Sequence, residues 1–297
     1  MIDFQPITPQ LHSTYAPYLE QAAMQGCEYS FVNQFLWGQQ KAAIVEDCLV
    51  VFAQYGRSSV YLYPTGEGDK KKALDAVLED AAQRGINCRL AGMTDAEKQE
   101  LQRFYPDVFC YHCDRDDFDY VYSIEDLAQL RGRKFQKKRN HLNRFFENNP
   151  AAAFVPITEE NLPRVEQLCR QWFDQRLAED PYADLRMEQI ALMKALHRWE
   201  ELPLEGLLLL IEDQPVAMCL GSRVSREMFD IHFEKALDGY DGAYAAINNA
   251  FAKYLQEKYP QIRHLNREDD LGIPGLRKAK LSYRPCKLLE KYIATFR

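Results

Sequence analysis

Apolar and polar positions follow the same order of strand and helix patterns in each half of the chain. In the first half, alternating residues predict a hairpin at 41–55 and a strand at 58–64, which leads into a glycine-containing loop. Apolar residues at helical spacing then run from Ala73 to Ala82, and Gly85 marks the end of that helix. The remaining elements of this half are a strand at 87–93, a helix at 95–106 capped by Thr94, and strand-like alternation at 108–123.

The second half repeats this order. It is predicted to contain a hairpin at 205–225, a strand at 227–236, a glycine-containing loop at 237–244, a helix at 243–260, a strand at 262–269, a helix at 274–283 and a strand at 286–296. Two helices, around 160–176 and 187–200, precede the series. Such units predict an α/β (α+β) fold with mixed sheets and helices on both faces. The repeated order indicates an internal structural duplication.

The length of the chain agrees with two domains. Its 297 residues are enough for two domains of ordinary size, and 46% hydrophobic with 27% charged residues is typical of globular proteins. We place the boundary between residues 125 and 126. The predicted domains are therefore 1–125 and 126–297, and the second begins with a basic segment.

The net charge excludes a protein that is basic all over its surface. A formal charge of −7 means that any site for a polyanion must be local. The first ten residues lack the pattern of a signal peptide, and the longest apolar run, 207–211, is too short to span a membrane. We therefore expect a cytoplasmic protein without a membrane-spanning segment. Cys110 and Cys113 lack further ligands at suitable spacing, so no metal site is predicted.

The segment from Leu127 to Phe146 is a candidate for a local polyanion site, because it contains no Asp or Glu. On a helical projection, one side carries Lys134, Lys137, Lys138, His141 and Arg144, and a neighbouring apolar stripe carries Phe135, Leu142, Phe145 and Phe146. Arg139 and Asn143 form a separate pair, one turn apart, which is expected to point into the protein. The segment is either a basic face that contacts phosphates or the solvated side of a linker helix.

The two glycine-containing loops are candidate anion sites. A strand that runs through such a loop into a helix places backbone N–H groups and the positive end of the helix where a phosphate can bind. In the second loop the candidates are Gly239, Gly242 and Ala243. The alternative is a turn that needs positive φ and has no ligand. Acidic residues in both loops weaken the case for an anion.

A polar face is predicted on the strand before the second loop. Period-two alternation places Asp230, His232 and Glu234 on one face, and the strand at 262–269 likewise carries His264, Asn266 and Glu268. If these strands are neighbours, the face offers a general base. The alternative is an exposed face with ordinary ion pairs. The stretch 266–285 adds basic residues, among them Arg277 and Lys280, and Tyr283 stands where a proton donor to a leaving group is needed.

Two motifs together resemble a known family. "LRGRKFQKKRNHLNRF" and "LNREDDLGIPGLRKAKLSYRP" are similar to a bacterial family related to the C-terminal domain of phosphatidylglycerol lysyltransferase, and the resemblance covers nearly the whole chain. It implies two tandem GNAT-like acyltransferase domains, each a mixed, mostly antiparallel sheet flanked by helices, akin to Fem-type aminoacyltransferases.

The resemblance implies a transferase. An acyl or aminoacyl group from aminoacyl-tRNA or acyl-CoA would pass to an amine or hydroxyl acceptor, a small molecule or a peptide, without a metal or a tightly bound cofactor. The base would come from His232, Glu234 and Glu268, and Tyr283 would be the acid. Donor phosphates would contact Gly239, Gly242, Ala243, Lys134, Lys137, Lys138, Arg139, Asn143, Arg277 and Lys280.

Two rivals to this interpretation stay open. The loop lacks the basic residue that begins the GNAT pyrophosphate motif, which favours a tRNA donor over acetyl-CoA. The first rival is a non-catalytic module that binds a small ligand or RNA. The second is a conventional acetyl-CoA-dependent N-acetyltransferase. The acceptor and the oligomeric state do not follow from the sequence.

Overall fold

The computed structural model describes residues 1–20, 26–55 and 58–297. These residues form two compact units. The first consists of Met1–Tyr120, Glu268–Arg277 and Lys287–Arg297, and the second of Val121–Arg267 and Lys278–Cys286. The prediction places one boundary at 125/126 between two continuous domains. In the structure, the first unit also includes two segments from the C-terminal part of the chain.

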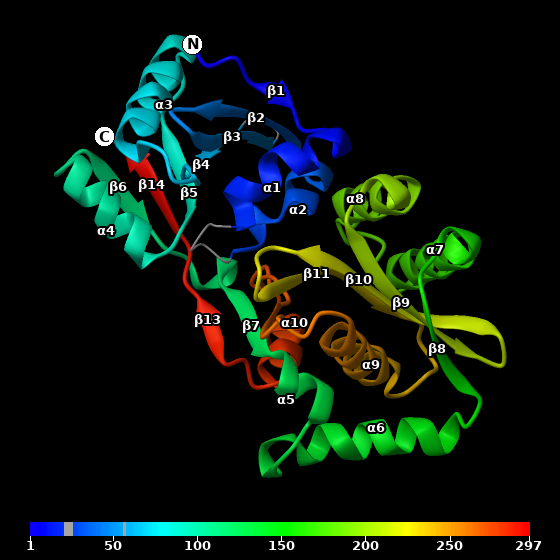
Figure 1. Cartoon of the computed structure of the whole chain (residues 1–297). Helices are drawn as coiled ribbons and strands as arrows, with labels where there is room; N and C mark the ends of the chain where they lie inside the picture. The colour runs from blue at the N-terminus through cyan, green and yellow to red at the C-terminus, as the bar shows by residue number, and fades with distance from the viewer. Residues whose placement is uncertain (21–25, 56–57) are drawn as a thin grey trace. The chain divides into compact units, whose positions relative to one another are not determined.

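The first unit is built on a seven-stranded mixed sheet with the order β1-β2-β3-β4-β5-β14-β6. Its strands are β1 Gln5–Pro6, β2 Gln39–Val45, β3 Cys48–Tyr55, β4 Ser58–Leu62, β5 Arg89–Met93, β6 Phe109–His112 and β14 Tyr292–Phe296. Its helices are α1 His12–Glu20, α2 Phe31–Leu36, α3 Lys70–Arg84 and α4 Asp95–Phe104. Strands β4 and β5 pair in parallel, because α3 carries the chain back between them. Helices α1 and α3 lie on opposite faces of this sheet (Figure 1).

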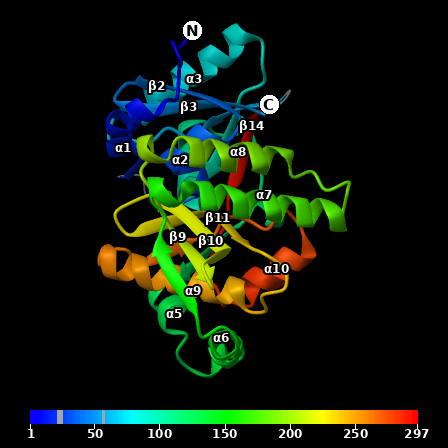
Figure 2. The same cartoon turned by 90° about the vertical axis from the view of Figure 1, so that its right-hand side faces the viewer.

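The second sheet has the order β13-β7-β12-β11-β10-β9-β8. Its strands are β7 Asp119–Ser123, β8 Ala152–Pro156, β9 Leu204–Ile211, β10 Gln214–Arg223, β11 Met228–Ala236, β12 His264–Asn266 and β13 Lys287–Leu289. The remaining helices are α5 Ile124–Gln129, α6 Gln136–Asn148, α7 Leu162–Glu179, α8 Arg186–His197, α9 Ala243–Lys258 and α10 Pro274–Leu281. Helices α7 and α9 lie on opposite faces of β9–β11 (Figures 1 and 2).

The predicted repetition of elements is confirmed. In each unit a hairpin is followed by a strand, a glycine-containing loop and a helix that leads to a parallel neighbour. Local signals set these elements as expected: Gly85 ends α3 with a φ of 67°, and Thr94 begins α4 with a capping box to Glu97. The α/β prediction with two mixed, mostly antiparallel sheets is therefore confirmed.

The strand predicted at 286–296 is wrong as a single element. The chain forms β13 and β14 instead, and β14 is inserted between β5 and β6 of the first sheet. At the break, the Lys291 ammonium is buried and donates to Asp119 Oδ1 at 2.8 Å and Glu28 Oε1 at 2.7 Å. Strand-forming apolar residues lie on both sides of Glu290 and Lys291, so the composition of the stretch did not reveal the change of partner.

Candidate active site

The loop between β11 and α9 borders a cavity of the second unit. Gly239 and Gly242 have φ values of 90° and 89°, which side chains rarely adopt, and no side chain caps the helix at Gly242. The loop borders a cavity of about 500 Å³. The cavity is lined by Lys138, His141, Tyr283 and the consecutive residues 237–245. Both loop glycines and Ala243 therefore line a real cavity at a helix N-terminus, as the anion-site hypothesis requires.

A second cavity, of about 480 Å³, adjoins the first. Its lining is almost entirely basic: Arg133, Lys134, Lys137, Lys138, His141, Ser282 and Arg284. Lys138 and His141 line both cavities. Lys134 is paired with Asp126 at 2.6 Å, but no carboxylate lines this cavity. The basic face of α6 is thus concave rather than flat, which suits a phosphate-bearing ligand.

A buried ion pair lies beside the first cavity. Arg267 Nη2 donates to Glu234 Oε1 at 2.9 Å, and Asn248 Nδ2 donates to Glu234 Oε2 at 3.0 Å. Both carboxylate oxygens therefore already accept hydrogen bonds, which makes Glu234 an anchor for Arg267 and a poor base. The Arg267 guanidinium lies 4.8 Å from the centroid of the Tyr283 ring. Arg267 Nη1 is buried and has no hydrogen-bond partner among the described residues.

Lys138 and Tyr283 meet at the edge of this ion pair. Lys138 Nζ lies 3.7 Å from the centroid of the Tyr283 ring. Burial, followed by the positive charge of Arg267, lowers the pKa of Lys138 to about 8. Burial raises the pKa of Tyr283 to about 12, so this phenol keeps its proton at neutral pH. The site therefore contains a protonated hydroxyl and an amine that titrates near neutrality.

The predicted common face of Asp230, His232 and Glu234 is wrong. The pairing register shifts from Leu220↔Phe233 to Gly221↔Ile231, so His232 is an extra residue in β11. Beyond this bulge the side chains exchange faces, and Glu234 reaches Asn248 of α9. His232 instead lies against Ser222 Oγ, at 2.7 Å from its Nε2, and near Asp230 Oδ2, at 3.4 Å from its Nδ1.

The bulge has a signal in the sequence. A Cβ atom on Gly221 would lie 1.9 Å from the Asp230 carbonyl oxygen, so only glycine fits this position. A glycine in the interior of a strand often marks such a bulge. The side chain of His232 is completely buried, which leaves it no access to the cavity beside Glu234.

Glu268 is also not part of a strand face. The strands β11 and β12 do pair, over Met228–Asp230 and His264–Asn266, but β12 ends at Asn266. Glu268 has a φ of 56° and belongs to the first unit, where its carboxylate accepts a hydrogen bond from Asn33 Nδ2 at 2.9 Å. The prediction of a continuous His264–Asn266–Glu268 face is therefore wrong.

Arg277 and Lys280, two basic residues predicted to contact the donor, bind other groups of the protein instead. Arg277 belongs to the first unit and is paired with Asp270 at 2.8 Å and Asp116 at 2.5 Å. Lys280 is buried and donates to the carbonyl of Arg267. These contacts already satisfy both cations, and neither residue lines the two cavities.

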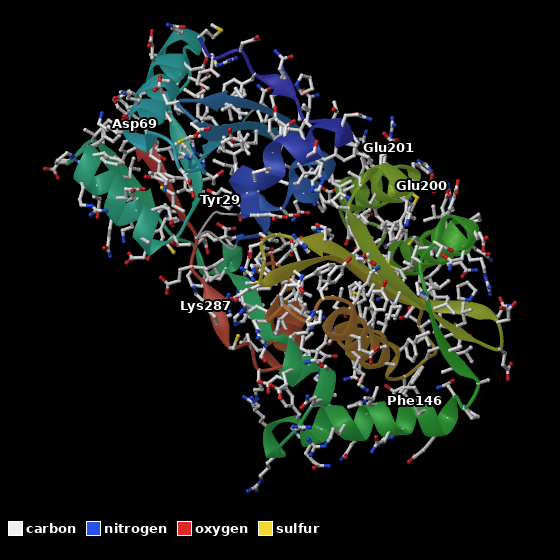
Figure 3. The ribbon with its side chains drawn as sticks, viewed as in Figure 1. Tyr29, Asp69, Phe146, Glu200, Glu201 and Lys287 are labelled. Carbon is white, nitrogen blue, oxygen red and sulfur yellow. The ribbon has the colours of Figure 1, made fainter. Side chains whose placement is uncertain are left out.

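The prediction that Arg139 and Asn143 point into the protein is also wrong. Arg139 donates to the carbonyl oxygens of Leu130 and Gly132 and closes the turn before α6. Asn143 is exposed on the helix surface. The predicted apolar stripe is buried at Phe135, Leu142 and Phe145. Phe146, toward the end of α6, is 41% exposed (Figure 3).

Sequence reasoning also missed residues that the cavities bring together. Arg267 and Asn248 were not assigned a role, and neither were Arg133, Arg284 and Ser282. Arg267 stands in the quoted motif "LNREDD", so its family context was the available signal. Asn248 lies at the helical spacing that places it beside Glu234, but only the fold identifies its partner.

A compact acidic cluster in the first unit resembles a cation site. Ligand atoms of Cys27, Glu28 and Asp119 lie within 4.8 Å of one another. However, the Lys291 ammonium stands among them, at 2.7 Å from Glu28, 2.8 Å from Asp119 and 3.8 Å from Cys27 Sγ. A lysine charge thus already occupies the place of a metal ion.

The chain is similar to several proteins, over all or part of its length. A solved structure of a conserved protein of unknown function from Bacteroides thetaiotaomicron is 37% identical, with a TM-score of 0.95 and complete coverage of both chains. An uncharacterised protein of Mycoplasmoides gallisepticum is 28% identical over 185 residues, which are 59% of this chain and 55% of that protein. The match therefore spans about half the length of that curated relative.

Two more distant structures share the fold. L-PGS from Bacillus licheniformis is 16% identical with a TM-score of 0.69, covering 100% of this chain and 94% of that one. FemX is 12% identical with a TM-score of 0.62, covering 100% of this chain and 98% of that one. These likenesses show the fold, and they confirm the predicted tandem GNAT architecture.

None of the helices in the described part of the chain combines the length and the hydropathy needed to cross a membrane. The family described as "Phosphatidylglycerol lysyltransferase, C-terminal" matches residues 19–295, nearly the whole chain. The protein therefore belongs to the phosphatidylglycerol lysyltransferase C-terminal domain family.

Proposed function

We propose that this protein is an aminoacyltransferase that takes an aminoacyl group from aminoacyl-tRNA and passes it to an amine or hydroxyl acceptor in the cytoplasm. One observation carries the proposal. An open glycine loop at the N-terminus of α9 borders one cavity, and a basic cavity adjoins it across the shared residues Lys138 and His141. Family membership and the fold shared with L-PGS and FemX support the same class of reaction.

The two cavities suit the two parts of such a donor. The phosphodiester end of an RNA carries several negative charges, and the basic cavity presents Arg133, Lys137 and Arg284 without a lining carboxylate. The first cavity, about 500 Å³, falls within the usual range for small-molecule sites and would hold the ester. The donor would therefore cross α6 at Lys138.

The first cavity is a poorer match for the pyrophosphate of acyl-CoA. Its loop carries Asp238 and Asp241, and among the residues that the structure describes an ion-pair partner is found for Asp238 alone, which is Arg176. Carboxylates at this position repel a pyrophosphate placed on the loop glycines. The same carboxylates favour the α-ammonium of an aminoacyl ester. Acyl-CoA is therefore the less favoured donor.

The reaction needs no group beyond the chain, because an aminoacyl ester is already activated. Attack on its carbonyl creates negative charge on oxygen, and preorganised donors stabilise such charge. The Tyr283 hydroxyl, which keeps its proton at neutral pH, is a candidate donor to that oxygen or to the leaving oxygen. Arg267 holds the positive charge next to it.

The proposal is tested by donor consumption. The purified chain is incubated with labelled aminoacyl-tRNA and, separately, with acetyl-CoA, in the presence of hydroxylamine as a general acceptor. We expect ester consumption with aminoacyl-tRNA, and a roughly tenfold or larger loss in Arg133→Ala/Lys137→Ala, because two phosphate contacts are removed. The matched control is Lys71→Ala/Lys72→Ala on α3, two lysines of the first unit that line neither cavity.

Three outcomes would contradict the proposal. If neither donor is consumed but RNA still binds, the chain is a binding module. If acetyl-CoA alone is consumed, it is a conventional acetyltransferase. If the α3 control loses as much activity as the α6 variant, the basic cavity does not hold the donor.

A further inference from the structure

We propose that Lys138 is the proton acceptor of this transfer: its amine takes the proton that the acceptor nucleophile loses as it attacks the ester. This inference rests on the proposed function and deepens it. It replaces the expectation that the base comes from His232, Glu234 or Glu268.

The position of Lys138 carries the argument. It lines the cavity that would hold the ester and also the basic cavity that would hold the phosphates. Its Nζ lies over the ring of Tyr283, at 3.7 Å from the centroid. Within the described part of the chain, Lys138 makes no ion pair with a carboxylate within 4.0 Å, whereas its neighbour Lys134 is held by Asp126. The amine is therefore placed at the junction where the reacting atoms would meet.

The groups that face Lys138 favour its neutral form. Burial and the guanidinium of Arg267 lower the pKa of Lys138 to about 8, and Glu234 opposes this only partly because Arg267 holds its carboxylate. The other titratable groups that line its two cavities are Asp238, Tyr240, Asp241 and Tyr244 of the glycine loop and the start of α9, Tyr283 after α10, His141 on its own helix, and Arg133, Lys134, Lys137 and Arg284 around the basic cavity. A base of pKa near 8 is suited to work at physiological pH.

The other candidate bases are placed less well. His232 is buried at the bulge against Ser222 and Asp230. Glu234 accepts from Arg267 and Asn248 with both oxygens. His141 is the remaining rival, because it is exposed and lines both cavities.

The step balances without a further reactant. The acceptor binds as the uncharged amine, its nitrogen attacks the ester carbonyl carbon, and a C–N bond forms. The nitrogen gives one proton to neutral Lys138 Nζ, which becomes an ammonium. As the ester C–O bond breaks, that ammonium gives the proton to the departing oxygen. The products are an amide and a free hydroxyl on the RNA, and Lys138 is again neutral.

The test is a pH profile of single-turnover consumption of aminoacyl-tRNA with hydroxylamine as the acceptor probe, with donor Kd measured in parallel. In the wild type we expect the rate to rise to a plateau with a midpoint near pH 8. In Lys138→Met and Lys138→Arg we expect the rise to be lost and the rate at pH 8 to fall by roughly 100-fold or more. Because Lys138→Arg keeps the positive charge, its donor Kd should stay within about threefold. Each variant is checked for folding by circular dichroism.

A second measurement does not depend on activity. The titration of the Lys138 amine is followed by NMR on ¹³C-methylated protein, with its signal assigned from Lys138→Arg, and a midpoint near 8 is expected. If Lys138→Arg keeps the wild-type rate and midpoint, the inference is overturned while the proposed function stands. The same follows if His141→Ala removes the midpoint. If the wild type consumes no donor, the proposed function fails and the inference fails with it.

Discussion

The two glycine-containing loops occupy the same place in the order of elements, but different parts of the protein pack against them. Each follows a strand of a mixed sheet and leads into a long helix that crosses to a parallel neighbour. In the first unit this helix is α3, and in the second it is α9. The loops differ in what lies against them, and that difference decides which of them has room for a ligand.

The first loop is closed by the hairpin beside it. A Cβ atom on Gly68 would lie 1.9 Å from the Glu46 carbonyl oxygen, and Thr65 pairs with Leu49 through two backbone hydrogen bonds. Asp69, at the start of α3 (Figure 3), accepts a hydrogen bond from the Lys72 amide at 3.1 Å. The carboxylate thus occupies the helix terminus that an anion would need.

The second loop has no such cover. Apart from its chain neighbours, no atom of the described residues lies within 4 Å of the position that a Cβ of Gly239 would take, and α9 begins at Gly242 without a side-chain cap. The neighbour of this loop is α6, whose Phe145 lies 3.0 Å from the Cβ position of Gly242. A basic helix therefore replaces the β-hairpin as the neighbour. The comparison shows that a glycine loop before a helix indicates an anion site only when its surroundings leave the helix terminus open.

The largest expected effect concerns the ion pair beside the open loop. Glu234→Ala removes the partner of the buried Arg267 guanidinium and should lower the free energy of unfolding by about 3–5 kcal/mol. Urea denaturation measures this loss. The matched change beside the closed loop, Lys72→Ala, removes an exposed partner of Asp69 and should cost less than about 0.5 kcal/mol. Equal losses in the two variants would contradict the idea that only the open site rests on a buried ion pair.

The next effect tests the closed loop itself. Gly68→Ala forces a methyl group against the backbone of Glu46 and should destabilise the protein by about 3 kcal/mol, because backbone has to move. Gly239→Ala meets open space and should cost about 1 kcal/mol, from its φ of 90° alone. Thermal unfolding of both variants provides the comparison. A larger loss in Gly239→Ala would mean that the second loop is the more tightly covered of the two.

The sequence predicted most of the fold, because the order of elements depends on local signals. Period-two and helical spacing, Gly85 after α3 and the Thr94–Glu97 box all act within a few residues. The break between β13 and β14 depends instead on Lys291, whose carboxylate partners Asp119 and Glu28 are far away in the chain. A periodic pattern does not carry information about such distant partners.

The candidate site was predictable only in part, for the same reason. Lys137, Lys138 and the loop glycines could be identified because a basic run and a glycine loop are visible locally. The common face predicted for His232 and Glu234 is wrong because one bulge residue exchanges the faces of β11. Gly221 was the local sign of that bulge, but its meaning depends on the backbone of Asp230 across the sheet.

A smaller effect concerns the cap of the closed loop. Asp69→Ala removes the hydrogen bond to the Lys72 amide and should cost about 1 kcal/mol of stability. Asp69→Asn should recover most of this loss, because its carbonyl oxygen can accept the same bond. Urea denaturation distinguishes the two variants. If Asp69→Ala is as stable as the wild type, water replaces the hydrogen bond of the cap, and the first loop is less closed than its contacts indicate.

The smallest effect is a pH dependence of stability that belongs to the open site. Unfolded lysine keeps its proton up to a pH of about 10.4, whereas Lys138 in the folded chain loses it near pH 8. Between these values the unfolded chain binds more protons, so the free energy of unfolding rises with pH. Below pH 8 the half-buried ammonium lowers the free energy of unfolding by a constant amount. Lys138→Met should therefore be slightly more stable than the wild type.

This advantage of Lys138→Met should shrink from pH 8 to pH 10. We expect a change of less than about 1 kcal/mol, because water screens a side chain that is only half buried. Urea denaturation of both proteins at several pH values measures it, and other titrating groups cancel in the difference. Lys138→Arg is the matched control, since arginine stays charged throughout and should show no such rise relative to Lys138→Met. Parallel wild-type and Lys138→Met curves over this range would mean that Lys138 is hydrated like an ordinary surface lysine, and the open loop would then lack the amine that sets it apart from the closed one.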